Sequence, residues 1–255
     1  MGALLEARGL CKSFGNTGEE QICVLKDVDI KLEKGEFAAI MGQSGSGKST
    51  LLYNISGMDQ KSSGTVTFDG EDISRLRDQE MSKLRLKKMG FIFQHSHLLK
   101  NMSIRDNILL PAYKAQIKSK AEVIKDTDVL MKKLGIDKVG GHDITKVSGG
   151  QLQRAAICRA LINHPRILFC DEPTGALNSG ASLEVMNILN AINQEGTTIL
   201  LVTHDVKVAS RADRVIFLTD GSIEAELKLG KYIENMKDSK QREEKLLDWL
   251  NKRGF

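Results

Sequence analysis

The sequence has no apolar run that approaches the length of a membrane span, which excludes a chain that crosses the bilayer by its own helices. Residues 1–8 lack the layout of a secretory signal peptide, in which a basic start precedes an apolar stretch. We therefore expect any role at a membrane to depend on a partner protein.

Aromatic residues make up only 5% of the sequence, and no basic stripe with interleaved aromatics occurs. Together with a formal net charge of only +4, this disfavours a nucleic-acid partner. The four cysteines form no C-x-x-C pair and indicate reduced thiols of a cytosolic protein: Cys11, Cys23, Cys158 and Cys170. The 255 residues, 41% of them hydrophobic, are enough for one large α/β domain or for a domain with a small satellite.

One stretch, residues 42–50, matches the phosphate-loop pattern G-x-x-x-x-G-K-[ST] in full. A buried strand is predicted over residues 37–41 and a helix from residue 50, which is the context that the motif needs. Glycines let successive backbone N–H groups turn toward a phosphate, and the helix N-terminus adds the positive end of its dipole. The predicted phosphate-binding residues are Gly42, Gln43, Ser44, Gly45, Ser46, Gly47, Lys48, Ser49 and Thr50.

Two of these residues have specific predicted tasks. Lys48 reaches the outer phosphates as a point charge, and the Ser49 hydroxyl holds Mg²⁺. Strands are predicted on both sides of a polar stretch at residues 15–20, with alternating burial over residues 28–32. Phe14, placed just after the first of them, is either a core residue or a plate on which adenine stacks.

The middle of the chain is predicted to be mostly helical. A charged helix is expected over residues 72–88 and a helical region over residues 104–134, with a core stripe of Val123, Ile124, Val129, Leu130 and Leu134. Between them a short apolar strand, residues 90–93, ends at Gln94. Gln94 is either a Mg²⁺ or water ligand or an ordinary polar loop residue.

A second potential anion site lies about a hundred residues after the phosphate loop. Ser148 is a good N-cap for a helix, and Gly149 and Gly150 leave backbone N–H groups accessible at its start, before Gln151. The alternative is a glycine-rich helix start without a ligand.

Carboxylates and a histidine follow two further apolar strands. The stretch at residues 166–174 is predicted to be an apolar strand that ends in two carboxylates. Asp171 is predicted to hold Mg²⁺, while Glu172 can orient or deprotonate an attacking water. His204 ends the strand at residues 197–203, where it is either structural or in contact with a γ-phosphate. In the charge-rich tail, Leu246, Leu247 and Leu250 share a helical face that packs on the domain or binds a partner.

In this order the motifs resemble the nucleotide-binding subunit of an ATP-binding cassette (ABC) transporter, over about residues 4–226. Ser148-Gly149-Gly150-Gln151 is the most specific element, and Phe91-Ile92-Phe93-Gln94 with Asp171–Leu177 resembles the branch of macrolide, lipoprotein-release and bacitracin-type export ATPases. The resemblance implies a P-loop NTPase (RecA-like) α/β core with an antiparallel β subdomain and an inserted helical subdomain at about 97–163. It implies a cassette over 1–226 and a C-terminal helical extension over 227–255.

The resemblance also implies two copies closing head to tail, with ATP between the phosphate loop of one and Ser148–Gln151 of the other. Phe14 becomes the adenine plate, Gln94 a Mg²⁺-sensing residue, Glu172 the general base and His204 the γ-phosphate switch. The implied cofactors are ATP and Mg²⁺. The implied partner is an integral membrane permease, which would hold the chain at the cytoplasmic face of the membrane.

Three positions depart from the family pattern: Val147, Cys170 and Asn178. Asn178 stands where the family usually has Asp, in a loop that couples the two sites, so the charge that supports coupling is missing. The expected function is an ATPase that powers export or extraction of an amphiphile or antimicrobial peptide. The alternatives are a mechanotransmitting cassette without transport and a soluble cassette of translation or DNA repair, which the lack of a tandem copy weakens.

Overall fold

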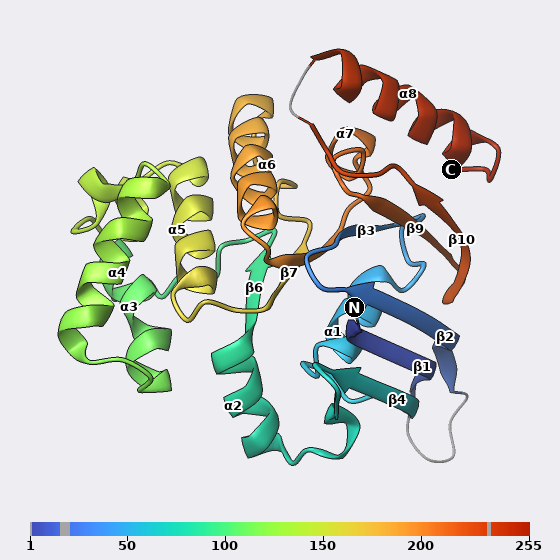
Figure 1. The fold of residues 1–255 in the computed structure, drawn as a ribbon, viewed down its shortest axis with the longest axis horizontal. Helices are drawn as coiled ribbons and strands as arrows, with labels where there is room; N and C mark the ends of the chain where they lie inside the picture. The colour runs from blue at the N-terminus through green and yellow to red at the C-terminus, as the bar shows by residue number, and fades with distance from the viewer. Residues whose placement is uncertain (1, 16–20, 234–235) are drawn as a thin grey trace. The chain divides into compact units, whose positions relative to one another are not determined.

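The computed structural model describes residues 2–15, 21–233 and 236–255. The chain divides into two compact units (Figure 1). Unit 1 comprises Met1–Met81 and Asn193–Phe255, and unit 2 comprises Ser82–Ile192, so unit 2 is an insertion within unit 1. The domain bounds predicted from the sequence, with a helical subdomain at about 97–163, stay a prediction.

Unit 1 contains an antiparallel sheet in the order β2-β1-β4-β5. Its strands are β1 (Ala3–Phe14), β2 (Ile22–Glu33), β4 (Ser63–Phe68) and β5 (Glu71–Asp72). Along β2, Val28, Ile30 and Leu32 are buried while Asp29 and Lys31 are exposed, which confirms the predicted half-buried strand. Of the polar stretch predicted between β1 and β2, residues 16–20 lie outside the described residues.

Unit 1 also contains parallel strands in the order β9-β3-β8, with β10 antiparallel to β9. These are β3 (Phe37–Met41), β8 (Thr198–Val202), β9 (Arg214–Thr219) and β10 (Ser222–Lys228). Every residue of β3 and β8 is buried, as expected for parallel strands covered on both faces. The helical segments of unit 1 are α1 (Lys48–Ile55), η1 (Ile73–Arg75), α7 (Val206–Ala209) and α8 (Met236–Asn251).

Unit 2 contains the parallel pair β6 (Met89–Phe93) and β7 (Ile167–Asp171). Helices α3 (Ile104–Ala115), α4 (Lys120–Lys133) and α5 (Gly149–Leu161) pack against one another (Figure 1). Short turns η2 (Asp137–Val139) and η3 (Ile144–Lys146) connect α4 to α5. Helices α2 (Asp78–Lys88) and α6 (Ser179–Gln194) lie at the two ends of unit 2 in sequence.

The helical region predicted at residues 104–134 is interrupted in the structure. Gln116 ends α3 in the left-handed conformation, with φ of 52°. Ser119 then starts α4 through a capping box with Glu122, which satisfies backbone donors at the new helix start. Likewise the helix predicted from residue 72 begins only at Asp78, because Asp72 caps a 3₁₀ turn and Leu76 is extended.

The core stripe predicted along α4 is only partly correct. Val123 and Leu134 are buried, but Ile124 and Val129 are 40% and 59% exposed. Thr127 and Met131 are buried instead, because residues 123, 127, 131 and 134 follow the helical repeat more closely.

Candidate functional site

The phosphate loop follows β3 directly and ends at the start of α1. A Cβ atom on Gly42 would lie 2.1 Å from the carbonyl oxygen of Leu218, so no side chain fits at this position. Gly47 caps α1 with φ of 97°, a conformation that favours glycine. Helix α1 begins at Lys48, two residues before the predicted start, so its N-terminal N–H groups face the loop.

Lys48 folds back over the loop that precedes it. Its Nζ donates to the carbonyl oxygens of Gly42 at 2.9 Å and Gln43 at 2.6 Å. A cation surrounded by backbone donors of a helix start suits an anion with several oxygens. The loop residues therefore fit a nucleotide phosphate, and the Ser49 hydroxyl at the first turn of α1 fits a Mg²⁺ ligand.

His204 lies at the same edge of the parallel strands as the phosphate loop. β3 and β8 run in register with Ile40 opposite Val202, and the Thr203 N–H donates to the Ile40 carbonyl at 3.1 Å. His204 is exposed just beyond this edge. Parallel α/β sheets bind ligands at the carboxyl ends of their strands, so His204 and the loop share one side of unit 1.

Phe14 is the last residue of β1, rather than lying after it, and it is 47% exposed. The Lys12 ammonium lies 4.6 Å from the centre of its ring and is paired with Asp59 at 2.9 Å. The interpretation of Phe14 as a core residue is therefore wrong. An exposed ring with a cation on one face leaves its remaining surface for stacking.

In unit 2, Gln94, Asp171 and Glu172 come together at the ends of β6 and β7. Phe93 lies opposite Asp171 in the parallel register, and Gln94 follows Phe93. A Cβ on Gly175 would lie 3.0 Å from Gln94 Nε2, so the amide packs against the turn after Glu172. Glu172 has φ of 49°, a strained conformation of the kind that concentrates at functional sites.

Gln153 is a residue of this site that the sequence analysis missed. It is 2% exposed, and its Nε2 donates to the carbonyls of Phe93 at 2.9 Å and Pro173 at 2.7 Å. One amide thus joins α5 to the residue before Gln94 and the residue after Glu172. The sequence does contain a pattern that could have identified it: Gln153 is a polar residue three and four positions before Ala156 and Ile157, on the apolar face of the helix.

The second predicted anion site lies at the start of α5. Ser148 accepts a hydrogen bond from the Gln151 N–H at 3.3 Å, and the Gln151 side chain accepts from the Ser148 N–H at 2.9 Å. This capping box confirms the predicted N-cap and leaves the N–H groups of Gly149 and Gly150 without an intrahelical acceptor. An open hollow borders this helix start and includes Asn178 among its lining residues.

The Asn178 side chain has a structural task of its own. Its Oδ1 accepts a hydrogen bond from the Ala181 N–H at 2.9 Å, at the start of α6. Aspartate would supply the same acceptor, so the departure from the family pattern changes charge and leaves this contact intact.

The two buried cysteines near the site, Cys158 and Cys170, are unreactive thiols. All four cysteines are free thiols, and Cys158 and Cys170 are buried. Burial raises the pKa of Cys158 to about 12, and burial also raises the pKa of the Cys170 thiol next to Asp171. Both stay protonated at neutral pH and fill space rather than react.

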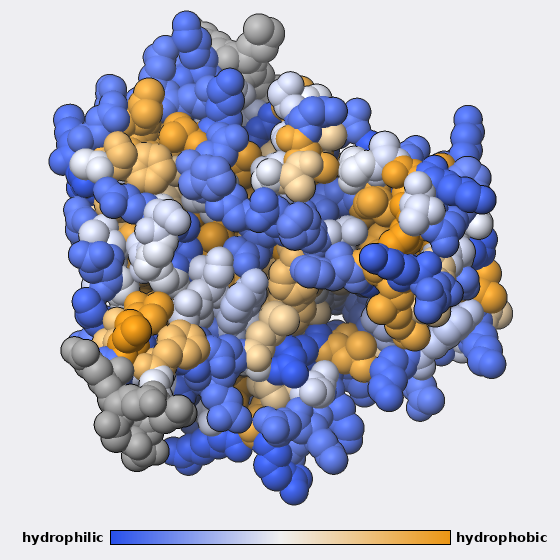
Figure 2. All heavy atoms as spheres, turned by 180° about the vertical axis from the view of Figure 1, so that it is seen from behind, coloured by the Kyte–Doolittle hydropathy of each residue, from blue (hydrophilic) through white to orange (hydrophobic). Residues whose placement is uncertain are grey.

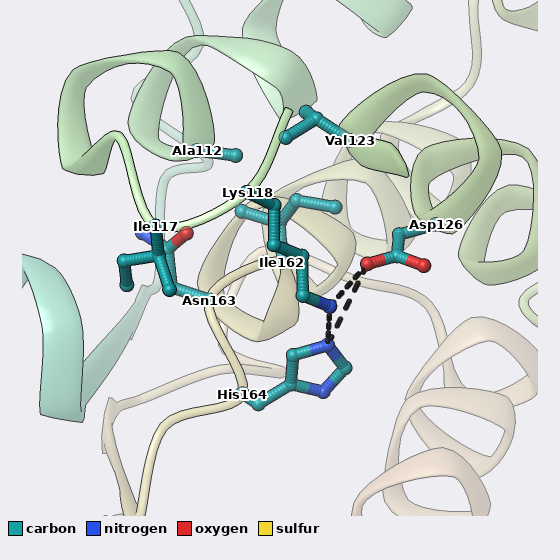
Figure 3. A pocket seen from close by; sticks show the side chains of 8 residues that line it. All are labelled: Ala112, Ile117, Lys118, Val123, Asp126, Ile162, Asn163 and His164. Atoms are coloured by element: carbon teal, nitrogen blue, oxygen red, sulfur yellow. Dashed lines mark hydrogen bonds and ion pairs between the residues drawn. The ribbon is translucent and has the colours of Figure 1, made fainter. Parts of the chain in front are cut away.

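Each unit thus presents its own set of predicted residues. Unit 1 holds Phe14, the phosphate loop and His204, whereas unit 2 holds Gln94, Ser148–Gln151, Asp171 and Glu172. A separate pocket of unit 2, formed by α3, α4 and the turn after α5, contains none of them (Figure 3). Among the described residues no cluster of three or more His, Cys, Asp or Glu could hold a metal ion.

Comparison with known proteins gives one consistent result. The family model described as "ABC transporter" matches residues 25–175. The bacitracin export ATP-binding protein BceA of Halalkalibacterium halodurans is 43% identical over 229 residues, covering 89% of this chain and 90% of that protein. The macrolide export ATP-binding/permease protein MacB 1/2 of Paracoccus denitrificans is 42% identical over 227 residues, 89% of this chain.

The chain spans only about a third, 34%, of the length of the MacB relative. Among solved structures, the ATP-binding cassette MJ0796, a dimer in a post-hydrolysis state bound to ADP and Pi, superimposes with a TM-score of 0.82. It is 37% identical and aligned over 89% of this chain and 100% of its own. This confirms the predicted P-loop NTPase fold, and the chain belongs to the ABC transporter family as an ATP-binding cassette that hydrolyses ATP.

Proposed function

We propose that ATP binds between two copies of this chain, arranged head to tail, and that its hydrolysis powers a separate membrane permease. The helix start of α5 carries the proposal: two glycine N–H groups at a capped helix N-terminus border an open hollow. A phosphate loop is sufficient to hold a triphosphate, so a second anion site in the same chain is explained by a nucleotide bound to another copy. The dimeric ADP-bound structure of the similar cassette supports this arrangement.

Within that arrangement Phe14 stacks on adenine and Lys48 binds the outer phosphates. Residues 42–50 donate backbone N–H groups, and Ser148, Gly149, Gly150 and Gln151 of the second copy contact the γ-phosphate. Ser49, Gln94 and Asp171 hold Mg²⁺, which when bound neutralises charge on the phosphate oxygens. His204 contacts the γ-phosphate, and this contact is lost when the γ-phosphate is cleaved off.

Glu172 is the proposed general base. Its carboxylate accepts a proton from water as the water oxygen bonds to the γ-phosphorus and the bond from phosphorus to the β,γ-bridging oxygen breaks. ADP and phosphate are the products, and loss of the γ-phosphate removes the contact that holds the two copies together.

The proposed partner is an integral membrane permease, and the proposed cargo is an amphiphile or antimicrobial peptide. BceA and MacB, at 43% and 42% identity, are both named as export proteins. No helix within the described ranges is long and apolar enough to cross a membrane. Hydrophilic side chains cover most of the face shown in Figure 2, with hydrophobic side chains in separate patches. In this proposal the permease holds the chain at the cytoplasmic face of the membrane.

The alternative is a cassette that transmits motion without transport. It is less favoured because the two relatives, MacB and BceA, are both named as export proteins. Reconstitution with the permease in vesicles distinguishes export from transmission of motion, since only export predicts ATP-dependent movement of cargo across the bilayer.

The test of the proposed site uses Glu172→Gln and Lys48→Ala in the full chain. Glu172→Gln should keep ATP binding, lower hydrolysis at least about 100-fold, and trap a dimer in Mg-ATP, because only the proton acceptor is lost. Lys48→Ala should weaken nucleotide binding itself. Titration with a fluorescent nucleotide measures ATP binding, phosphate release measures the rate of hydrolysis, and light scattering measures dimer formation. A Glu172→Gln variant with a normal hydrolysis rate, or one that stays monomeric in Mg-ATP with the permease present, refutes the proposal.

A further inference from the structure

The chain returns to the phosphate loop after its last helix. Residues 252–255 leave α8 and turn back at Gly254, which has a positive φ of 74°. The Gly254 carbonyl accepts a hydrogen bond from Gln43 Nε2 at 3.0 Å. Gln43 is the first variable residue of the phosphate loop, and both partners belong to unit 1.

Helix α8 is anchored firmly enough to support this contact. Arg242 is 6% exposed and donates to four backbone carbonyls at 2.7–3.0 Å: those of Ser210, Ala212, Leu229 and Gly230. Leu246 and Leu250 are fully buried, whereas Leu247, predicted on the same face, is 46% exposed. The helix predicted in the tail therefore packs on its own unit.

An aromatic cluster connects the end of α8 to the strands that carry the loop. Phe217 of β9 makes edge contacts with Trp249 and Phe255, each at 6.1 Å between ring centres. Phe217 lies opposite Met41, the residue before Gly42, and the Leu218 carbonyl is the one that excludes a side chain at Gly42. The tail thus touches the loop at Gln43 and supports the strand beside its first glycine.

We propose that residues 252–255 position Gln43 and hold the phosphate loop in its nucleotide-binding form. The Gln43 carbonyl accepts from Lys48 Nζ at 2.6 Å, so the orientation of this residue also sets where the lysine lies. A loop that is ordered before the nucleotide arrives loses less conformational entropy on binding. This inference rests on the proposed role of residues 42–50 in phosphate binding.

The experiment removes residues 252–255 and separately replaces Gln43 by Met, which keeps the length of the side chain but cannot donate. Each change should weaken ATP binding about fivefold, which is about 1 kcal/mol and the usual net contribution of one hydrogen bond. The KM for ATP should rise in proportion, while kcat at saturating ATP changes by less than about twofold. Phe255→Ala supplies a point variant of the tail, and Leu247→Ala, on the exposed face of α8, is the matched control.

A double-mutant cycle decides between positioning and general stabilisation. Removing residues 252–255 from Gln43→Met should add clearly less loss of ATP affinity than the same removal causes in the wild type, because the contact between Gln43 and Gly254 is already gone. Thermal unfolding of each variant verifies that the fold persists. The inference is overturned by an unchanged or tighter ATP affinity without the tail, or by fully additive losses in the cycle. A wild-type chain that binds no ATP would instead refute the proposed function.

Discussion

At the scale of residues, Gln153 joins the ends of the two strands that carry the candidate site of unit 2. Its amide donates to backbone carbonyls at the ends of both strands that carry Gln94, Asp171 and Glu172. The side chain is buried, so water cannot replace it as a donor. Its two hydrogen bonds fix how the two strand ends lie relative to each other.

We expect Gln153→Leu to lower the free energy of unfolding by about 1–3 kcal/mol, because buried carbonyl oxygens lose their donor. ATP hydrolysis should fall in kcat more than in KM, since binding through the phosphate loop of unit 1 is retained. Urea unfolding and steady-state kinetics measure both effects. Gln194→Leu, an exposed glutamine at the end of α6, should change unfolding by less than about 0.5 kcal/mol. Equal effects of the two variants would contradict this role.

At the scale of elements, a cluster of Lys118, Asp126 and His164 lies at the connection between α3 and α4 (Figure 3). Lys118 Nζ donates to Asp126 Oδ2 at 2.5 Å, and it also lies 3.1 Å from His164 Nε2. The Lys118 hydrogen bond lowers the pKa of Asp126 from its ordinary value of 3.8. The carboxylate is therefore stabilised in the folded chain.

A lowered pKa in the folded state gives stability that is complete above pH 3.8, the ordinary value, and is lost as pH falls further. Asp126→Asn should therefore flatten the decrease in stability below about pH 4. At pH 7 it should reduce stability by roughly 0.2–1 kcal/mol, since the pair is partly exposed. Denaturant unfolding across pH measures this, with Asp137→Asn on the same unit as the control for one lost charge. An acid slope that is identical in wild type and Asp126→Asn would disprove the linkage.

At the scale of the whole molecule, Asn178 bears on coupling between the two nucleotide sites of the proposed head-to-tail dimer. It lines the hollow at the start of α5 and caps the start of α6 through Ala181. Aspartate can form the same cap, so the change to Asp adds a negative charge to this hollow without removing the contact.

We expect Asn178→Asp to raise the Hill coefficient of ATP hydrolysis toward two, the limit for two coupled sites. Stability should stay within about 0.5 kcal/mol of wild type. Asn178→Ser keeps a capping oxygen without the charge and should leave cooperativity as it is. Steady-state ATPase assays over a range of ATP concentrations measure both variants. If Asn178→Asp has the rate and Hill coefficient of the wild type, the missing charge does not limit coupling.

Local patterns were enough to predict much of this protein. The phosphate loop and the capped start of α5 depend on backbone conformations that glycine and a hydroxyl cap favour within a few residues of chain. The strands β3 and β8 follow from continuous apolar runs. These features were predicted because their causes are close in sequence.

Burial along α4 and the interruption at Gln116 were not predicted correctly, because several residues fit more than one helical register and only packing selects among them.

The sequence by itself determined the family, the phosphate-binding motif and the order of the candidate residues. Tertiary structure alone decided that Gln153 joins the ends of two strands, that Phe14 is exposed, and that Gly254 meets Gln43. The physical reason is separation along the chain: Gln43 and Gly254 are 211 residues apart, and only the packing of α8 against β9 brings them within hydrogen-bond distance.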